Sequence, residues 1–244
     1  MKRQVVAFNG SPNGPKGNTG FLLGQFIEGL KEGSAEVTLF NLCDMNIKPC
    51  LGDLACWLRT DGDCIQNDDM IKILPVMQKT DIIVFASPLY VDGMTGILKN
   101  TIDRMIPLVL PFVEVMGEHM WHPWRNEKRE IKMSLVSTCG FWKIENFDPL
   151  VAHMKAMAKN FSAEYVGALL RPHAPAFRTM HQSGAPVDDI IHAARTAGKE
   201  LAETGKMKDS DLQVVSRPVI ERDEYVDRLN ELFGEILEKK GKIN

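Results

Sequence analysis

The alternation of short apolar runs with helical patterns constrains the fold of this chain most. Runs rich in branched and aromatic side chains occupy residues 4–9, 36–40, 81–86, 131–137 and 165–170. After each run, apolar residues recur at helical spacing, over residues 18–31, 68–79, 96–110, 147–161 and 188–203. The third of these helices is expected to be interrupted at Pro107 and Pro111. The run at 81–86 is apolar at nearly every position, as a strand covered on both faces requires. These five β-α units predict an α/β fold with a parallel, doubly wound, five-stranded sheet and helices on both faces.

The length of 244 residues suits one α/β domain plus an extension. We expect a domain over residues 1–205 and a helical extension over residues 206–244. The extension is predicted to form a short helix and then a longer amphipathic one, whose apolar residues are Tyr225, Leu229, Leu232, Phe233, Ile236 and Leu237. An amphipathic helix of this kind packs on its own domain or on a partner subunit.

Composition argues against several classes of partner. The net charge of −3 leaves no basic footprint for nucleic acid, and no apolar run reaches the roughly 20 residues that span a bilayer. The segment before the first strand is too short for a signal peptide. Structural disulfides are not expected, because the five cysteines are odd in number and no export signal is seen. We therefore expect a cytoplasmic protein that binds neither nucleic acid nor membrane.

The glycine-rich loop at residues 10–20 joins the first strand to the first helix. Its glycines permit a tight turn, and the helix start offers unpaired N–H groups to a phosphate. Ser11, Asn18 and Thr19 add uncharged donors. The loop matches neither Gly-x-Gly-x-x-Gly nor a Gly-Lys-Ser/Thr ending, which disfavours a dinucleotide or ATP-hydrolysing site. It predicts a monophosphate site; the alternative is a simple turn capped by Asn18 or Thr19.

Two more loops reach the same edge of the predicted sheet, because the carboxyl ends of parallel strands meet there. The first follows the third strand and includes Tyr90, which offers a flat aromatic face or fills the core at the strand end. The second follows the fourth strand, where Cys139 either is a buried small residue or lines the pocket. After the fifth strand, Arg171 and His173 are candidates for contact with a nucleotide or substrate.

Three motifs together resemble the NAD(P)H-dependent FMN reductase superfamily. They are Gly10-Ser11-Pro12 with Gly17-Asn18-Thr19, Ser87-Pro88-Leu89-Tyr90 ahead of Lys99 and Asp103-Arg104, and the cysteine-bearing loop from Pro49 to Met70. The third motif is similar to that of the superfamily's iron–sulfur flavoprotein branch. The resemblance covers about residues 4–205 and implies a flavodoxin-like fold with strand order 2-1-3-4-5. It also implies a homodimer or homotetramer.

The activity that the resemblance implies is an FMN-dependent oxidoreductase, which passes electrons from NAD(P)H to a quinone, a flavin or another small acceptor. The alternative is a non-enzymatic carrier that relays electrons between redox proteins through FMN, with or without an iron–sulfur cluster. No catalytic side chain is expected, because the flavin itself accepts the hydride. Lys99, Asp103 and Arg104 are expected to be structural.

The resemblance assigns FMN to residues of the three loops. Its phosphate is expected at Ser11, Pro12, Gly17, Asn18 and Thr19. Its ring and ribityl chain are expected along Pro88, Leu89, Tyr90, Val91 and Gly93. Topology adds a third wall at Thr138, Cys139 and Gly140.

The cysteine loop brings Cys50, Cys56 and Cys64 into fifteen positions. The iron–sulfur branch that it resembles carries four cysteines, and Asp53 stands where one of them is expected. Three thiolates still allow a [4Fe-4S] or [3Fe-4S] cluster, and Cys43 is a possible substitute. The alternatives are zinc, although no histidine lies in the loop, or no metal, with the cysteines and Trp57 as packing residues.

Overall fold

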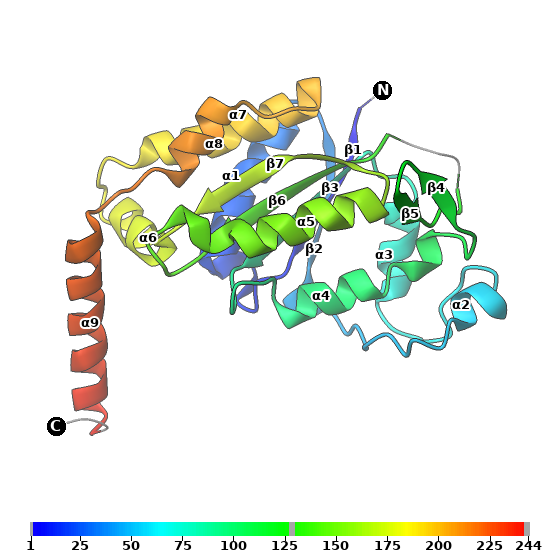
Figure 1. Cartoon of the computed structure of the whole chain (residues 1–244). Helices are drawn as coiled ribbons and strands as arrows, with labels where there is room; N and C mark the ends of the chain where they lie inside the picture. Colours follow the sequence, from blue (N-terminus) through cyan, green and yellow to red (C-terminus); the bar gives the residue numbers. More distant parts are fainter. Residues whose placement is uncertain (1, 127–129, 242–244) are drawn as a thin grey trace.

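Five parallel strands form the central sheet, seen in a computed structural model that describes residues 2–126 and 130–241. The strands lie in the order β2-β1-β3-β6-β7 (Figure 1). Their bounds are β1 (Gln4–Asn9), β2 (Glu36–Asn41), β3 (Ile82–Pro88), β6 (Lys132–Thr138) and β7 (Glu164–Arg171). Counted along the chain, this is the order 2-1-3-4-5, and every neighbouring pair is parallel. The predicted doubly wound sheet is confirmed.

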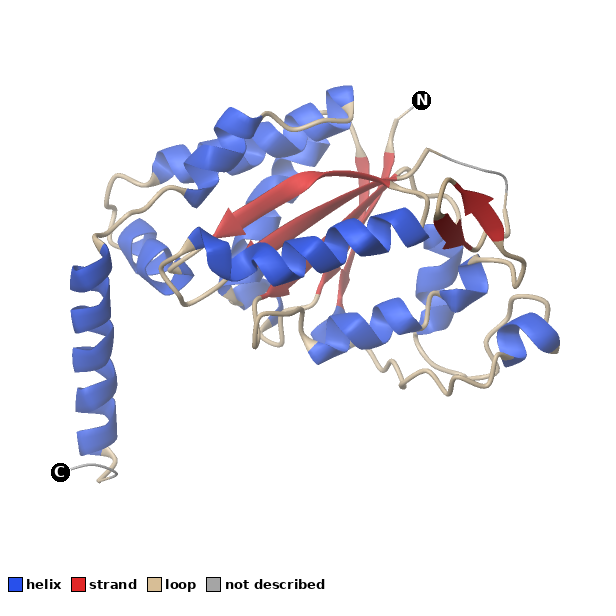
Figure 2. Ribbon diagram, viewed as in Figure 1, coloured by secondary structure: helices blue, strands red, loops and turns tan. Residues whose placement is uncertain are grey.

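Helices cover both faces of the sheet (Figures 1 and 2). One face carries α1 (Asn18–Glu32), α7 (Asp188–Thr204) and α8 (Asp209–Ser216). The other carries α3 (Met70–Met77), α4 (Gly96–Asp103) and α5 (Asp148–Asn160). Each face has its own apolar core, and residues 82–86 of β3 are completely buried between them. The near-continuous apolar run of that strand is therefore explained by burial on both sides.

Helices α1 and α7 approach each other closely through glycines. A Cβ atom on Gly29 would overlap the carbonyl of Arg195, and one on Gly198 would overlap the carbonyl of Phe26. Both positions therefore need the absence of a side chain, so that the two backbones can touch. The contact joins the first helix of the chain to the last helix of the sheet domain.

Two predicted helices are shorter than expected. The helix predicted over residues 96–110 ends at Asp103, and a separate 3₁₀ turn covers Ile106–Leu108. Pro107 explains this ending, because its ring clashes with the carbonyl four residues earlier and it has no N–H to donate. Helix α3 begins at Met70 rather than at Asp68, whose carboxylate accepts from Met70 N at 3.1 Å.

Several elements were not predicted from the sequence. Helix α2 (Ala55–Leu58) lies in the cysteine loop, and α6 (Ala174–Gln182) follows β7. A hairpin of β4 (Glu114–Met116) and β5 (His119–Trp121) lies in the insertion at residues 111–130, of which residues 127–129 are outside the described chain. Short 3₁₀ helices cover Gly14–Lys16, Leu42–Asp44 and Ile144–Phe147.

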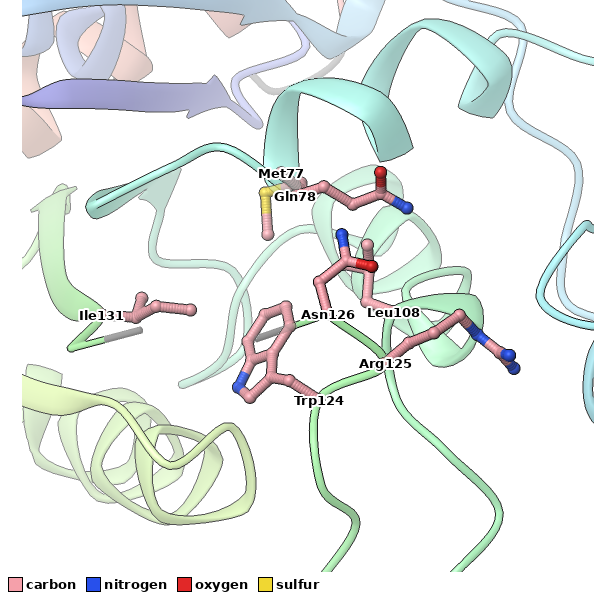
Figure 3. A pocket seen from close by; sticks show the side chains of 7 residues that line it. All are labelled: Met77, Gln78, Leu108, Trp124, Arg125, Asn126 and Ile131. Atoms are coloured by element: carbon pink, nitrogen blue, oxygen red, sulfur yellow. The ribbon is translucent and has the colours of Figure 1, made fainter. Parts of the chain in front are cut away.

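The insertion packs on the domain. Trp124 Nε1 donates to the Phe161 carbonyl at 2.7 Å, and the ring of His122 lies 4.8 Å from that of Trp57 in the cysteine loop. Figure 3 shows the small cavity beneath it, lined by Met77, Gln78, Leu108, Trp124, Arg125, Asn126 and Ile131. Its volume of about 10 Å³ has room for one water molecule at most, so this cavity holds no cofactor.

The tail divides into a packed part and a projecting part. Helix α8 packs on α7 and β7, with Val215 completely buried. Helix α9 (Arg222–Lys239) stands away from the domain in Figure 1. Within it Tyr225 is buried, whereas Leu232 and Phe233 are each 52% exposed. Across residues 2–126 and 130–241, no helix has both the length and the hydropathy of a membrane span.

Candidate functional site

The loop after β1 is fixed by hydrogen bonds from three sides. Ser11 N donates to Asn9 Oδ1 at 3.1 Å, and Gly10 N donates to the Ala86 carbonyl of β3 at 2.7 Å. The hydroxyl of Thr95, at the start of α4, donates to the Gly10 carbonyl at 2.7 Å. The loop is thus held in a preset shape by polar groups that are buried.

The N-terminus of α1 opens directly from this loop. Gly17 precedes the helix and no side chain caps it, so the first N–H groups of a 15-residue helix lack helical partners. The capping role that the alternative gives to Asn18 or Thr19 is therefore wrong. A Cβ on Gly17 would lie 2.6 Å from Ser11 Oγ, and one on Gly20 would overlap the Gly14 carbonyl. The glycines let the loop close around the helix start, an arrangement whose free N–H groups and dipole end favour an anion.

A cavity of about 160 Å³ brings the three predicted loops together. Ten of the predicted residues line it: Ser11, Gly17, Asn18, Thr19, Pro88, Leu89, Tyr90, Thr138, Cys139 and Gly140. Pro12, Val91 and Gly93 do not line it. Three further residues do, namely Asn13, Ala174 and Pro175. The last two begin α6, and Pro175 near its start was the one available signal for that helix.

Tyr90 to Gly93 form a tight turn at the rim of the cavity. Tyr90 N donates to the Gly93 carbonyl at 3.0 Å, and Gly93 N donates to the Tyr90 carbonyl at 3.1 Å. Val91 and Asp92 have φ angles of +46° and +59°, a conformation that is strained for a β-branched residue. Tyr90 is half exposed and Val91 is fully exposed, so the alternative of a core aromatic at Tyr90 is wrong.

The third wall is tied to the other two loops. Thr138 Oγ1 lies 2.7 Å from Thr19 Oγ1, and the Thr138 carbonyl accepts from Leu89 N at 2.8 Å. Cys139 is buried and also lines the cavity, which satisfies both expectations for it. Burial raises the pKa of the Cys139 thiol, so this group is neutral at neutral pH.

Arg171 and His173 do not reach the cavity, and their prediction as ligand contacts is wrong. Both side chains are completely buried, and Arg171 Nη2 lies 2.8 Å from His173 Nε2. Burial, and then the nearby Arg171 charge, lowers the pKa of His173 to about 4. Burial lowers the pKa of Arg171 to about 9. The pair lies behind the third wall, where His173 N donates to the Phe141 carbonyl at 2.7 Å.

A second cavity, of about 190 Å³, is lined by Cys50, Cys56 and Cys64 together with Asp53. Burial raises the pKa of the Cys56 thiol, and the neighbouring Cys64, Cys50 and Asp53 raise it further. Arg104 Nη2 donates to Cys64 Sγ at 3.3 Å. The cysteine loop therefore gathers three sulfur atoms and one cation around one space.

Asp53 is engaged within its own loop. One carboxylate oxygen accepts from Ala55 N at 3.2 Å, at the start of α2, and the other lies 3.2 Å from Arg59 Nη2. Cys43 is exposed and does not line the cavity, so it is not a substitute ligand. In the part of the chain that the structure describes, no three His, Cys, Asp or Glu side chains lie close enough together for a single metal ion.

Arg104 also forms a buried ion pair with Asp68, as its structural assignment predicts. The distances are 2.6 Å from Nη1 to Oδ2 and 3.2 Å from Nη2 to Oδ1. Asp103 instead pairs with Lys99 on the surface of α4, at 2.6 Å. A larger cavity of about 730 Å³ lies beside the cysteine loop, between α4, α5 and the hairpin.

Several known proteins are similar to this chain in sequence. Residues 3–123 match the family model of NADPH-dependent FMN reductases. An iron–sulfur flavoprotein of Archaeoglobus fulgidus is 46% identical over 101 residues, which are 41% of this chain and 48% of that protein. One of Methanocaldococcus jannaschii is 29% identical over 208 residues, which are 84% of this chain and 98% of that protein. The chain thus spans about half of the first relative and nearly all of the second.

Solved structures share the fold. An FMN-dependent NADH-azoreductase from Bacillus anthracis, in complex with FMN, has a TM-score of 0.59 at 13% identity, over 83% of this chain and all of that one. An NAD(P)H:quinone oxidoreductase from Methanothermobacter marburgensis has a TM-score of 0.57 at 14% identity, over 82% and 97% of the two chains. At these identities the likeness shows the flavodoxin-like fold.

Proposed function

The chain belongs to the NADPH-dependent FMN reductase family, and from this we propose that it is an FMN-dependent oxidoreductase that passes electrons from NAD(P)H to a quinone, a flavin or another small acceptor. One observation carries the proposal. Loops from the carboxyl ends of β1, β3 and β6 line a single cavity, and the uncapped start of α1 opens into it. Ligands of doubly wound sheets bind at this edge.

The phosphate of FMN fits the loop around Gly17. The helix start supplies N–H groups and the positive end of a dipole, and Ser11, Asn18 and Thr19 line the cavity beside it. These donors are uncharged, so they stabilise a monophosphate without a lysine or a metal ion. The hydroxyl of Thr19 is shared with Thr138, which positions the helix start against the third wall.

The flavin ring fits along Pro88, Leu89 and Tyr90. Tyr90 is half exposed and offers an aromatic face, and Cys139 and Gly140 border the cavity from the β6 side. FMN, when bound, supplies the hydride-accepting chemistry. The task of these residues is to orient the ring and to exclude water from one side of it. The neutral thiol of Cys139 places no negative charge at that wall.

We further propose an iron–sulfur cluster held by Cys50, Cys56 and Cys64. The three cysteine side chains line one cavity. As thiolates their negative charges would repel one another, and bound iron relieves this repulsion. In a cluster each thiolate binds a different iron, so the thiolates need not meet at one ion. Asp53 is occupied by α2 and Arg59, which favours a [3Fe-4S] cluster or a [4Fe-4S] cluster with one iron not bound by cysteine.

We place the protein in the cytoplasm as a homodimer or homotetramer. All five cysteines are free thiols, which suits a reducing compartment. The apolar side chains on α9 are exposed in the single chain, which supports burial against another subunit. The relay of electrons to another redox protein is a second candidate function, favoured by the cysteine cavity.

Anaerobic purification followed by visible spectroscopy and iron analysis tests these assignments. A flavin spectrum, a submicromolar FMN affinity of the apoprotein and rapid NADH or NADPH oxidation with a quinone acceptor are expected. Oxidation only in the presence of a ferredoxin-like protein would favour the carrier. A colourless protein that does not bind FMN would refute the proposed function.

A further inference from the structure

The tail after α7 is joined to the third wall of the cavity by hydrogen bonds. Tyr225 Oη donates to the Gly140 carbonyl at 2.6 Å. Trp142 Nε1 donates to the Ile220 carbonyl at 2.9 Å. These bonds connect the start of α9 with the loop that follows β6, although the partners lie about 80 residues apart in the sequence.

A second pair of hydrogen bonds joins the tail to the residues at the end of β7, behind the third wall. Arg171 Nη1 donates to the Val215 carbonyl at 2.8 Å, and Val219 N donates to His173 Nε2 at 3.2 Å. The His173 ring stacks on that of Trp142, with centroids 6.0 Å apart and an interplanar angle of 19°. The low pKa of His173 keeps Nε2 free to accept. The tail is thus held to the wall from Val215 to Tyr225.

The tail contact orients the peptides of the loop. The Gly140 carbonyl is bound by Tyr225, and the Phe141 carbonyl is bound by His173 N at 2.7 Å. In a trans peptide the C=O and N–H groups point in opposite directions, so the Phe141 N–H points away from Tyr225. Across residues 2–126 and 130–241, the N–H groups of Gly140 and Phe141 find no acceptor. Gly140 lines the cavity, so donors remain free beside it.

We propose that residues 215–225 are part of the cofactor-binding apparatus, with Tyr225 as the positioning residue that fixes the Gly140 peptide for bound FMN. This inference rests on the proposed function. The loop needs such support, because Gly140 is exposed and the Phe141 side chain is 66% exposed, which leaves few apolar contacts to hold it. Tyr225 itself is 6% exposed, so its hydroxyl bond is protected from water.

Substitution Tyr225→Phe tests the proposal, because it keeps the buried ring and removes one hydroxyl group. The Kd for FMN should rise about threefold to tenfold, as expected for the loss of one hydrogen bond. The visible absorption bands of the bound flavin should shift as well. Tyr165→Phe at the start of β7 is the matched control, because it also removes one hydroxyl group but at a residue that does not line the cavity, and it should leave both unchanged. A Tyr225→Phe protein with the wild-type Kd and spectrum would overturn the proposal.

Amide hydrogen exchange in the FMN-free protein provides a test that needs no flavin. Exchange of the Cys139 and His173 amides, which form hydrogen bonds across the third wall, should be about threefold to tenfold faster in Tyr225→Phe and unchanged in Tyr165→Phe. Equal exchange in wild type and Tyr225→Phe would overturn the positioning role. A wild-type protein that binds no FMN would refute the proposed function instead, and the exchange rates would still show whether Tyr225 holds the loop.

Discussion

Replacing Arg104 by Met should destabilise the protein more than any other loss of a single surface or loop contact described above. The side chains of Arg104 and Asp68 are 1% and 0% exposed, and two hydrogen bonds join them. Without the guanidinium, the buried carboxylate keeps only the N–H groups of Lys48 and Met70. Removal of one partner of a buried pair costs about 3–5 kcal/mol. For a chain of this size, that lowers Tm by roughly 6–20 °C.

Urea unfolding of the FMN-free protein at pH 7, followed by circular dichroism, measures this loss. Lys99→Met is the matched control, because it removes a cation from the same helix but from a pair whose members are 45% and 47% exposed. The control should change the free energy of unfolding by less than about 0.5 kcal/mol. A loss below about 1 kcal/mol for Arg104→Met would refute the argument from burial.

The pH dependence gives a second check. Burial favours the neutral acid at Asp68, but hydrogen bonds from Arg104 and from the N–H groups of Lys48 and Met70 outweigh it and lower the pKa. The ionised carboxylate therefore stabilises the wild-type fold above the ordinary aspartate pKa of about 3.9, and this stabilisation is lost as pH falls through the lower folded pKa.

In Arg104→Met the pKa of Asp68 rises above its wild-type value, because burial remains and the cation is gone. Protonation then removes the uncompensated charge. The stability difference between variant and wild type should shrink as pH falls from 7 toward 4.5. A difference that stays constant over this range would show that the buried carboxylate is not its cause.

Three further predictions concern the two cavities and the turn at Val91. Gly17→Ala places a Cβ 2.6 Å from the Ser11 hydroxyl oxygen and should weaken FMN binding at least about tenfold in a fluorescence titration. Gly24→Ala, within α1, meets open space and should raise Tm slightly. Cys56→Ser should lower the iron content of anaerobically purified protein, and Cys43→Ser should not; equal iron in both would contradict the cluster site. Val91→Asn should stabilise the FMN-free protein by about 1 kcal/mol in urea unfolding, because asparagine tolerates the positive φ better than valine does. A loss of stability would show that the turn is not strained.

The sheet and most of its helices could be predicted from the sequence, because their signal is local. Strand β3 is recognisable from an apolar run that burial on both faces requires, and the loop after β1 is recognisable from glycines that the close packing around Gly17 requires. The three loops of the candidate site follow from topology alone once the sheet is parallel. The interruption expected at Pro107 is real, but α4 ends four residues before it, at Asp103.

The parts that could not be predicted depend on contacts between distant backbone groups. Trp142 and Tyr225 bind carbonyl oxygens, which every residue carries, so no sequence pattern marks their partners. Arg171 and His173 look like ligand contacts because charged residues at a strand end usually face solvent. Here the tail covers them, and only the folded chain shows that Val215 supplies the acceptor.

The close glycine contact between α1 and α7 has a consequence for synthesis of the chain. The apolar face of α1 is made among the first residues, but the helix that covers it leaves the ribosome about 160 residues later. At 5–20 residues per second, that is an interval of roughly 10–30 s. During this time Phe26 and its neighbours are exposed to other nascent chains and to chaperones. Completion of α7 therefore ends the exposure of this face of α1 during biosynthesis.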